Sequence, residues 1–336
     1  MSEPPLVAVL GGGRSAEHEI SLRSAASVAR GLRETGFRVL EVKIDRDGRW
    51  LHEGRPVALV PGEGLLGADL AFPVLHGPYG EDGTVQGVLD ALAIPFVGSG
   101  VAASAVCMDK LLFKDVLEAW GFPQVRYLPL AGAQARAAAA GERSELARLL
   151  SLGLPLFVKP ARCGSSLGIV KVERPDQLAP AVEAALRYDP KLIVEEGVRA
   201  RELECGLVEG EEGFACTPLG EVRVAGGWYD FAAKYTPGGM ELSVPAEVPD
   251  RVHQQAARLA VELAQRLGVA QLARVDFFLC GERLLVNELN TMPGFTETSV
   301  YPKLAGALGL SYPELLARLC ERALSRARSA PATASL

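Results

Sequence analysis

Apolar residues recur along the first third of the chain with two periods, one typical of buried strands and one typical of amphipathic helices. Residues 6–10 form an apolar run that leads into three glycines, and a helical pattern follows from Ser21 to Gly36, a residue type that commonly ends helices. Further apolar runs predict strands at 37–44, 71–75 and 94–97. This strand–helix–strand order predicts a parallel α/β sheet.

The remainder of the chain continues to mix strands and helices. Apolar runs at 156–159 and 192–195 predict strands on either side of a glycine-containing loop, whereas an Ala-rich stretch at 131–150 predicts a loop and helix without a site. Strand-like runs follow, with helices expected at about 250–267 and 312–326. We therefore expect three α/β lobes, divided as residues 1–107, 108–200 and 201–336.

The most informative polar positions lie in a hairpin that two strand-like runs predict on either side of Gly281–Glu282. Side chains alternate between the two faces of a strand, so residues two apart share a face. On this basis one face of the first strand carries Arg274, Asp276 and Phe278, and one face of the second carries Val286, Glu288 and Asn290.

The length of the hairpin loop decides whether these two faces meet. A three-residue loop pairs Cys280 with Leu284 and sets Asp276 opposite Glu288, and this is the register that we expect. A loop of two or four residues sends the two carboxylates to opposite faces. Two carboxylates beside an amide oxygen and a cation suit a divalent ion and a phosphate-bearing substrate. The alternative is a half-solvated hairpin with incidental charges.

Composition narrows the class of protein. The 336 residues carry a formal net charge of −6 without a basic block of five or more, which argues against nucleic-acid binding. No apolar stretch approaches the ~20 residues of a membrane helix, and the first residues lack the pattern of a secretory signal. The six cysteines include no C-x-x-C pair, which is typical of reduced thiols in a cytoplasmic protein, and the four histidines lack zinc-binding spacing.

A glycine turn at 11–16 follows the first strand and fits the loose dinucleotide fingerprint, which by itself suggests an NAD enzyme. Asp45, however, lies farther from the glycines than the roughly 20 residues expected of that fingerprint. Glu17 and Glu19 also crowd the position that an anionic pyrophosphate would take. We favour a tight turn that presents Glu17 to an ammonium group. The alternative is a plain turn before an acidic helix start.

Three further loops carry candidate chemistry. The Gly- and Ser-rich loop at 159–168 offers backbone N–H groups, hydroxyls and Lys159 to phosphate oxygens, although it is not a Walker A loop. The segment 228–239 is aromatic and basic before it breaks into glycine, which suits a lid. His76 follows the end of a predicted strand, where α/β proteins place their sites. The alternatives are a flexible hairpin, a packed loop and a structural histidine.

These segments together resemble the D-alanine–D-alanine ligases of the ATP-grasp superfamily across nearly the whole chain. The matching blocks are GGGRSAEHEIS at 11–21, LHGPYGEDGTVQG at 75–87, GSGVAASAVCMDK at 98–110, VKPARCGSSLG at 158–168, YDFAAKYTPG at 229–238, ARVDFF at 273–278 and NELNTMPGFTETS at 287–299. The resemblance implies an α/β, three-lobed ATP-grasp architecture. In it a doubly wound parallel N-terminal lobe joins two α+β lobes that enclose ATP.

The resemblance also implies binding roles for individual residues. The residues that match ATP-binding positions are Lys110, Lys159, Glu195, Val198, Glu202, Lys234 and Phe278. Asp276, Glu288 and Asn290 match magnesium ligands. Two Mg²⁺ ions are expected, for which Mn²⁺ can substitute.

The remaining matches concern the amino-acid substrates and catalysis. Glu17 matches the glutamate that binds the ammonium group of the first D-alanine, and Ser165 and Tyr235 match a pair that links this glutamate to the lid. The residues that match oxyanion and substrate positions are Arg274 and the Gly294 N–H for the oxyanion, Ser299 for the second carboxylate, and His76 and Val300 beside the substrate.

The resemblance implies that the protein ligates two D-alanines to D-alanyl-D-alanine, with ATP and a D-alanyl phosphate intermediate, for peptidoglycan precursor synthesis. A cytoplasmic homodimer is expected, with D-alanine and ATP as small-molecule partners and neither nucleic acid nor membrane. The alternative is a related ligase that uses D-lactate or D-serine as its second substrate. Tyr235 and the apolar Val300 favour D-alanine. An NAD(P) oxidoreductase or a catalytically inactive nucleotide-binding protein would leave the acidic hairpin without a function.

Overall fold

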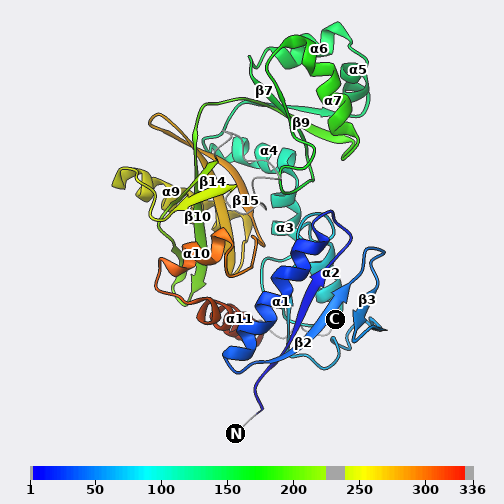
Figure 1. Cartoon of the computed structure of the whole chain (residues 1–336), viewed down its shortest axis with the longest axis vertical. Helices are drawn as coiled ribbons and strands as arrows, with labels where there is room; N and C mark the ends of the chain where they lie inside the picture. The colour runs from blue at the N-terminus through cyan, green and yellow to red at the C-terminus, as the bar shows by residue number, and fades with distance from the viewer. Residues whose placement is uncertain (1–2, 225–238, 330–336) are drawn as a thin grey trace.

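A computed structural model describes residues 3–224 and 239–329 of the chain, which form three sheets flanked by helices. In Figure 1 the three sheets lie at different positions along the long axis of the molecule. The chain passes from the lower part of the view to the upper part and then back. We call the three parts the N-terminal, central and C-terminal lobes. The expected α/β class and three-lobed architecture are confirmed.

The sheet of the N-terminal lobe has the order β4-β3-β2-β1-β5. Its strands are β1 (Leu6–Gly12), β2 (Arg38–Ile44), β3 (Trp50–His52), β4 (Arg55–Pro56) and β5 (Leu70–Pro73). β1 pairs in parallel with β2 and β5, as predicted, while β3 and β4 extend the edge in antiparallel fashion. The expected strand at 94–97 is reduced to a single bridge between Ala71 and Phe96.

Helices α1 (His18–Glu34), α2 (Thr84–Ala91) and α3 (Val101–Met108) accompany this sheet. α1 begins at His18, three residues before the predicted start at Ser21. The added turn combines a buried His18, an exposed Glu19 and a half-buried Ile20, so it has no apolar periodicity that could have revealed it.

The central lobe is an antiparallel sheet of order β6-β9-β7-β8. Its elements are β6 (Tyr127–Ala131), α5 (Gly132–Ala139), α6 (Arg143–Leu150), β7 (Leu156–Pro160), β8 (Val170–Val172), α7 (Leu178–Leu186) and β9 (Lys191–Glu196). Helices α5, α6 and α7 cluster on one side, where their apolar residues share a core with the strands (Figure 1). α4 (Lys110–Trp120) packs near this lobe through Leu111, which contacts Ile193 of β9.

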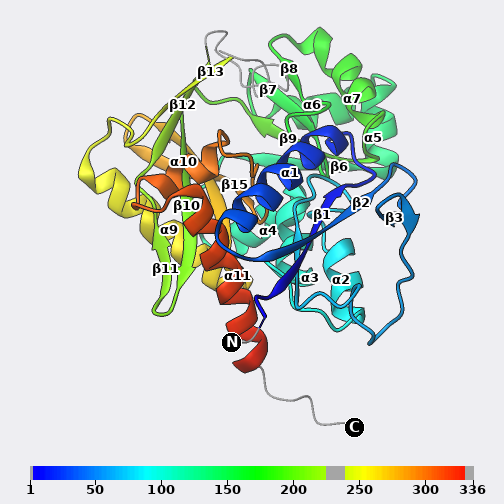
Figure 2. The same ribbon diagram turned by 60° about the horizontal axis from the view of Figure 1, so that its bottom comes forward.

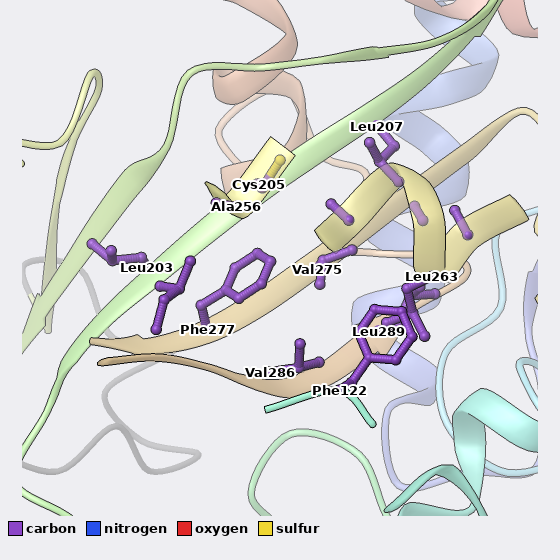
Figure 3. Packing of buried hydrophobic residues seen from close by; sticks show 14 of the residues in the cluster. Phe122, Leu203, Cys205, Leu207, Ala256, Leu263, Val275, Phe277, Val286 and Leu289 are labelled. Atoms are coloured by element: carbon purple, nitrogen blue, oxygen red, sulfur yellow. The ribbon is translucent and has the colours of Figure 1, made fainter. Parts of the chain in front are cut away.

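The C-terminal lobe has strands in the order β13-β12-β10-β14-β15, with β11 on β10. Its elements are β10 (Arg201–Gly210), β11 (Gly213–Cys216), β12 (Gly220–Val224), β13 (Met240–Ser243), α9 (Asp250–Leu267), β14 (Leu272–Cys280), β15 (Arg283–Asn290), α10 (Val300–Gly306) and α11 (Tyr312–Ser329). One sheet face packs against α9 through residues such as Leu203, Val275 and Phe277 (Figure 3). α9 has the predicted bounds.

The register that we predicted for the β14–β15 hairpin is wrong near its loop. Cys280 pairs with Arg283 and not with Leu284, so the loop is shorter than the three-residue loop that we expected. A bulge beside Asn287 then shifts the register, with Phe277 opposite Val286 but Asp276 opposite Glu288. Val286 therefore lies in the apolar core and does not share a face with Glu288 and Asn290. The predicted pairing of the two carboxylates is confirmed, for a different reason.

The last helix returns to the first lobe. Figure 2 shows α11 beside α1, and both contribute to one apolar core. Gly31 of α1 permits this approach, because a Cβ at that position would lie 2.6 Å from Leu316 Cδ1. Within the described residues, no helix has both the length and the apolar character needed to cross a membrane.

Candidate active site

A cavity of about 480 Å³ is lined by residues from all three lobes. Most of the predicted site residues line it. They are Glu17, His76, Lys110, Lys159, Ser165, Glu202, Arg274, Asp276, Phe278, Glu288, Asn290, Gly294, Ser299 and Val300. Glu195 and Val198 are not among the lining residues, and Lys234 and Tyr235 lie outside the described part of the chain.

One wall of the cavity is an acidic row across three strands of the C-terminal lobe. Asp276 of β14 pairs with Glu204 of β10 on one side and with Glu288 of β15 on the other. The Arg274 guanidinium donates to both Asp276 oxygens at 2.7 and 2.6 Å and lies 3.0 Å from Glu204 Oε2. The Asn290 amide donates to Asp276 Oδ2 at 3.2 Å. The row thus concentrates three carboxylates around one buried cation.

The charge balance of this row suits a divalent cation. Burial raises the pKa of Asp276 to about 8, opposed by Arg274 and reinforced by Glu204 and Glu288. Despite its own burial, the pKa of Arg274 is held well above its ordinary value by Asp276 and Glu204. The described residues contain no group of three or more His, Cys, Asp or Glu side chains arranged to hold a metal. A set of two carboxylates and an amide, however, offers the oxygen ligands that Mg²⁺ prefers.

Glu17 enters the cavity from the glycine turn after β1. Its carboxylate accepts a hydrogen bond from the Ser165 hydroxyl of the central lobe. Gly77 and Gly164 enclose it, because a Cβ on either would lie 2.5 or 2.7 Å from Glu17 Oε2. The Glu17 side chain is 8% exposed. A carboxylate enclosed in this way offers negative charge to a cationic group such as an ammonium.

Two titratable groups stand next to Glu17. Burial lowers the pKa of His76, which Glu17 only partly offsets. Burial, and then repulsion by Glu17, raises the pKa of Glu81 to about 8, although Glu81 Oε2 accepts from the Gly77 N–H at 2.5 Å. The Ser15 hydroxyl, which donates to the His76 carbonyl at 2.6 Å, fixes the two loops to each other.

A lysine-rich wall comes from the central lobe and α4. Lys110 donates to the Cys163 carbonyl at 2.6 Å, which fixes one end of the Gly- and Ser-rich loop. Ser165 and Ser166 in this loop have φ angles of 49° and 57°, a left-handed conformation that is strained for residues with a side chain. Lys159 lies nearby and donates to Glu195 Oε2 at 2.5 Å. This wall offers cations and backbone donors, as an anionic ligand requires.

The opposite end of the cavity is formed by the segment between β15 and α10. Ser299 directly precedes α10, and its hydroxyl accepts from the Thr296 N–H at 3.0 Å. A Cβ at Gly294 would lie 3.3 Å from Ser299 Oγ, so the two predicted substrate residues are neighbours. Val300 is 6% exposed and adds an apolar surface beside them.

Sequence reasoning missed several residues of the site. Glu204 and Glu81 line the cavity, and Lys114 lies behind Lys159 against Glu195. Glu204 could have been found by strand alternation, because it lies two residues after Glu202 on the same face. Lys114 gave a weaker signal, as a lysine on the buried face of α4 with Leu111 and Leu117.

Comparisons with known proteins agree with this geometry. The profile described as "D-ala D-ala ligase N-terminus" matches residues 6–64 and 58–99, and that described as "D-ala D-ala ligase C-terminus" matches residues 116–321. The chain is similar to the D-alanine–D-alanine ligase of Mycolicibacterium smegmatis, with 44% identity over 363 residues, which cover 95% of each protein. The D-alanine–D-alanine ligase of Mycobacterium tuberculosis is similar to this chain with the same identity and coverage.

Solved structures show the same relationship. The D-alanine–D-alanine ligase from Coxiella burnetii has a TM-score of 0.84 and 33% identity, covering 98% of this chain and 96% of that one. The VanG D-Ala:D-Ser ligase from Enterococcus faecalis has a TM-score of 0.82 and 30% identity, covering 95% and 99%. Family profiles and relatives thus span nearly the whole chain, and the protein belongs to the D-alanine–D-alanine ligase family.

Proposed function

We propose that this protein joins two molecules of D-alanine to D-alanyl-D-alanine and converts ATP to ADP and phosphate. The observation that carries the proposal is the composition of one cavity. It brings an enclosed carboxylate, Glu17, together with the Lys110 and Lys159 wall and the acidic row at Asp276. These are the groups needed to hold an amino acid, a nucleotide and a divalent cation.

The nucleotide is assigned to the side of the cavity between the central and C-terminal lobes. Lys110, Lys159 and the loop at 164–168 face its phosphates, and Glu202 and Phe278, which pair across β10 and β14, face its ribose and base. We assign the backbone around Val198 and the lid residue Lys234 to the same ligand, on the family resemblance. Glu195 is buried behind Lys159, so we assign it to the charge balance of the lysines as well as to the adenine side.

The first chemical step joins D-alanine to phosphate. Glu17 holds the ammonium group of the first D-alanine and thereby directs its carboxylate toward the nucleotide. A carboxylate oxygen forms a bond to the γ-phosphorus, and the bond from this phosphorus to the bridging oxygen breaks, which releases ADP. Asp276, Glu288 and Asn290 would hold Mg²⁺, whose charge neutralises phosphate oxygens as the phosphoryl group moves. We propose two such ions.

The second step forms the peptide bond. The amine of the second D-alanine, whose carboxylate is placed at Ser299, attacks the carbonyl carbon of the acyl phosphate. The carbon–oxygen bond to phosphate then breaks, phosphate leaves with the electron pair and the nitrogen loses a proton. Arg274 and the Gly294 N–H are assigned to the negative oxygen that develops. Arg274 is held by Asp276 and Glu204, so its orientation is set before substrate arrives.

The second substrate is assigned as D-alanine. Val300 presents an apolar side chain beside Ser299, which suits a methyl group better than the hydroxymethyl group of D-serine. Tyr235, which also favours an amine nucleophile, lies outside the described residues. On family precedent we further propose a cytoplasmic homodimer that supplies peptidoglycan precursors. We retain the lobe boundaries after residues 107 and 200, the second of which directly precedes β10.

Phosphate release with ATP, Mg²⁺ and defined substrates tests the function. Release that requires D-alanine alone and yields the dipeptide is expected, with L-alanine as the inactive control. Enhanced release and a mixed product with D-lactate or D-serine would reassign the second substrate. Absence of release under all of these conditions would overturn the proposal.

A further inference from the structure

A buried lysine that the chemistry above does not use, Lys114, lies beside the Lys159–Glu195 ion pair. Its side chain is 1% exposed, and its Nζ lies 3.7 Å from Glu195 Oε1. In the described portion of the chain this Nζ has no hydrogen-bond partner. Buried ammonium groups normally satisfy their donors, so this one calls for a physical reason.

The three charged groups differ in their access to the cavity. Lys159 of β7 lines it, whereas Lys114 of α4 and Glu195 of β9 do not. Glu195 pairs with Phe157 across β7 and β9, so Lys159, two residues further along β7, projects from the same face. Of the three groups, Lys159 alone is placed to turn toward a ligand.

In the structure the three groups together carry an excess of positive charge. Two ammonium groups surround one carboxylate, whose Oε2 is taken by Lys159 at 2.5 Å. If Lys159 turns to a phosphate, the 3% exposed Glu195 carboxylate keeps a partner only if another cation is present. Burial lowers the pKa of Lys114, Glu195 raises it, and Lys159 lowers it again. When Lys159 moves away, its repulsion of Lys114 is lost, which favours the charged form of Lys114.

We propose that Lys114 is a positioning residue for nucleotide binding: it becomes the partner of Glu195 when Lys159 turns from that carboxylate to the nucleotide phosphates. The inference rests on the proposed use of ATP. In the structure Lys159 donates to one Glu195 oxygen, and the Lys114 Nζ lies 3.7 Å from the other. A small shift of Lys114 would therefore let it replace Lys159 as the partner of Glu195. Without Lys114, Lys159 would be retained by a buried carboxylate and the phosphates would lose a cation.

Lys114→Met provides the test, with ADP and Mg²⁺ titrated into the protein by calorimetry. We expect the affinity for ADP to fall by at least about tenfold, because Lys159 would stay on Glu195 and the phosphates would lose a charge-assisted hydrogen bond. The KM for ATP should rise more than kcat falls, and the KM for D-alanine should stay unchanged. The melting temperature should change little, because losing the attraction of Lys114 to Glu195 is offset by removing a buried ammonium group that Lys159 repels. Lys114→Gln is the second neutral variant and should behave alike.

Two controls separate this role from a general effect of charge or packing. Lys171→Met removes an exposed lysine of the same lobe, paired with Glu173, and should leave ADP affinity unchanged. In a double-mutant cycle, Lys114→Met should cost less than about twofold in ADP affinity when Glu195→Gln is already present, because no carboxylate then retains Lys159. An equal loss with and without Glu195→Gln would overturn the proposal, as would wild-type affinity in both neutral variants.

The same titration distinguishes the inference from the function on which it rests. A wild-type protein that binds no ADP would contradict the use of ATP itself. A wild-type protein that binds ADP, together with a Lys114→Met protein that binds it equally well, would contradict the role of Lys114 alone.

Discussion

The Ser165 hydroxyl donates a hydrogen bond to the Glu17 carboxylate, although the two residues are 148 positions apart in the chain. The bond connects the glycine turn of the N-terminal lobe to the Gly- and Ser-rich loop of the central lobe. Through it, the group assigned to the first D-alanine is joined to the loop assigned to the nucleotide phosphates. Substrate binding and phosphate binding are therefore expected to depend on each other.

Glu17→Ala should weaken binding of the first D-alanine by about 10- to 100-fold, the usual effect of losing a hydrogen-bonded charge. Initial rates at varied D-alanine concentrations measure this effect, with ATP saturating. Glu19→Ala is the matched control, because Glu19 is exposed and forms a surface ion pair with Arg46. An unchanged dependence on D-alanine in the Glu17 variant would remove this residue from the site.

Gly164→Ala should impair D-alanine binding while leaving stability nearly intact. The added Cβ would lie 2.7 Å from Glu17 Oε2, and the flexible carboxylate would move to relieve the contact. The KM for D-alanine and the melting temperature together report this separation. Gly100→Ala is the control, since its Cβ would meet no atom within 4 Å. A Gly164→Ala protein with wild-type KM would show that the enclosure of Glu17 is irrelevant to binding.

Asp276→Asn should lower turnover sharply without unfolding the protein, because the amide keeps the shape of the side chain but loses the charge offered to Mg²⁺. Turnover measured over a range of Mg²⁺ concentrations, with circular dichroism for the fold, provides the check. Wild-type turnover at ordinary Mg²⁺ concentrations would sink the metal assignment. Glu282→Gln, on the exposed hairpin loop, should retain full turnover.

Glu195 should make the free energy of unfolding depend on pH in the acidic range. Although burial alone would raise it, Lys114 and Lys159 hold the pKa of Glu195 at about 2, below its ordinary value of 4.5. The charged Glu195 carboxylate therefore stabilises the fold above pH 4.5, and this contribution disappears as the pH falls toward 2. Urea unfolding of wild type and Glu195→Gln should show a stability difference that narrows over this range. A constant difference would contradict the assigned pKa.

Sequence patterns predicted the elements with strong periodicity and the residues held in local motifs. Helix α9 is strongly amphipathic, and its predicted bounds are those of the structure. The hairpin shows the limit of this reasoning. Alternation alone cannot reveal that one residue is inserted at Asn287, so the predicted loop and the placement of Val286 were wrong even though Asp276 does face Glu288. Bulges depend on the fit of both strand ends to the rest of the fold.

The sequence predicted the site residues that belong to a motif, but it did not predict the contacts that arise from tertiary packing. Glu17, Lys159 and Asp276 each belong to a recognisable block and line one cavity. The pairing of Lys114 with Glu195 joins a helix to a strand that lies far along the chain, and neither residue has a local signal for the other. Burial of both groups follows from the packing of α4 on β9, which no short pattern specifies.

The packing of α11 on α1 also has a consequence for how the chain reaches this state during synthesis. The apolar face of α1 is completed by Leu315, Leu316 and Leu319 of α11, which is synthesised after all the other described elements. Until α11 is made, the first lobe exposes that face to solvent or to a chaperone. A chain truncated before α11 would thus lose the integrity of the lobe at its opposite end.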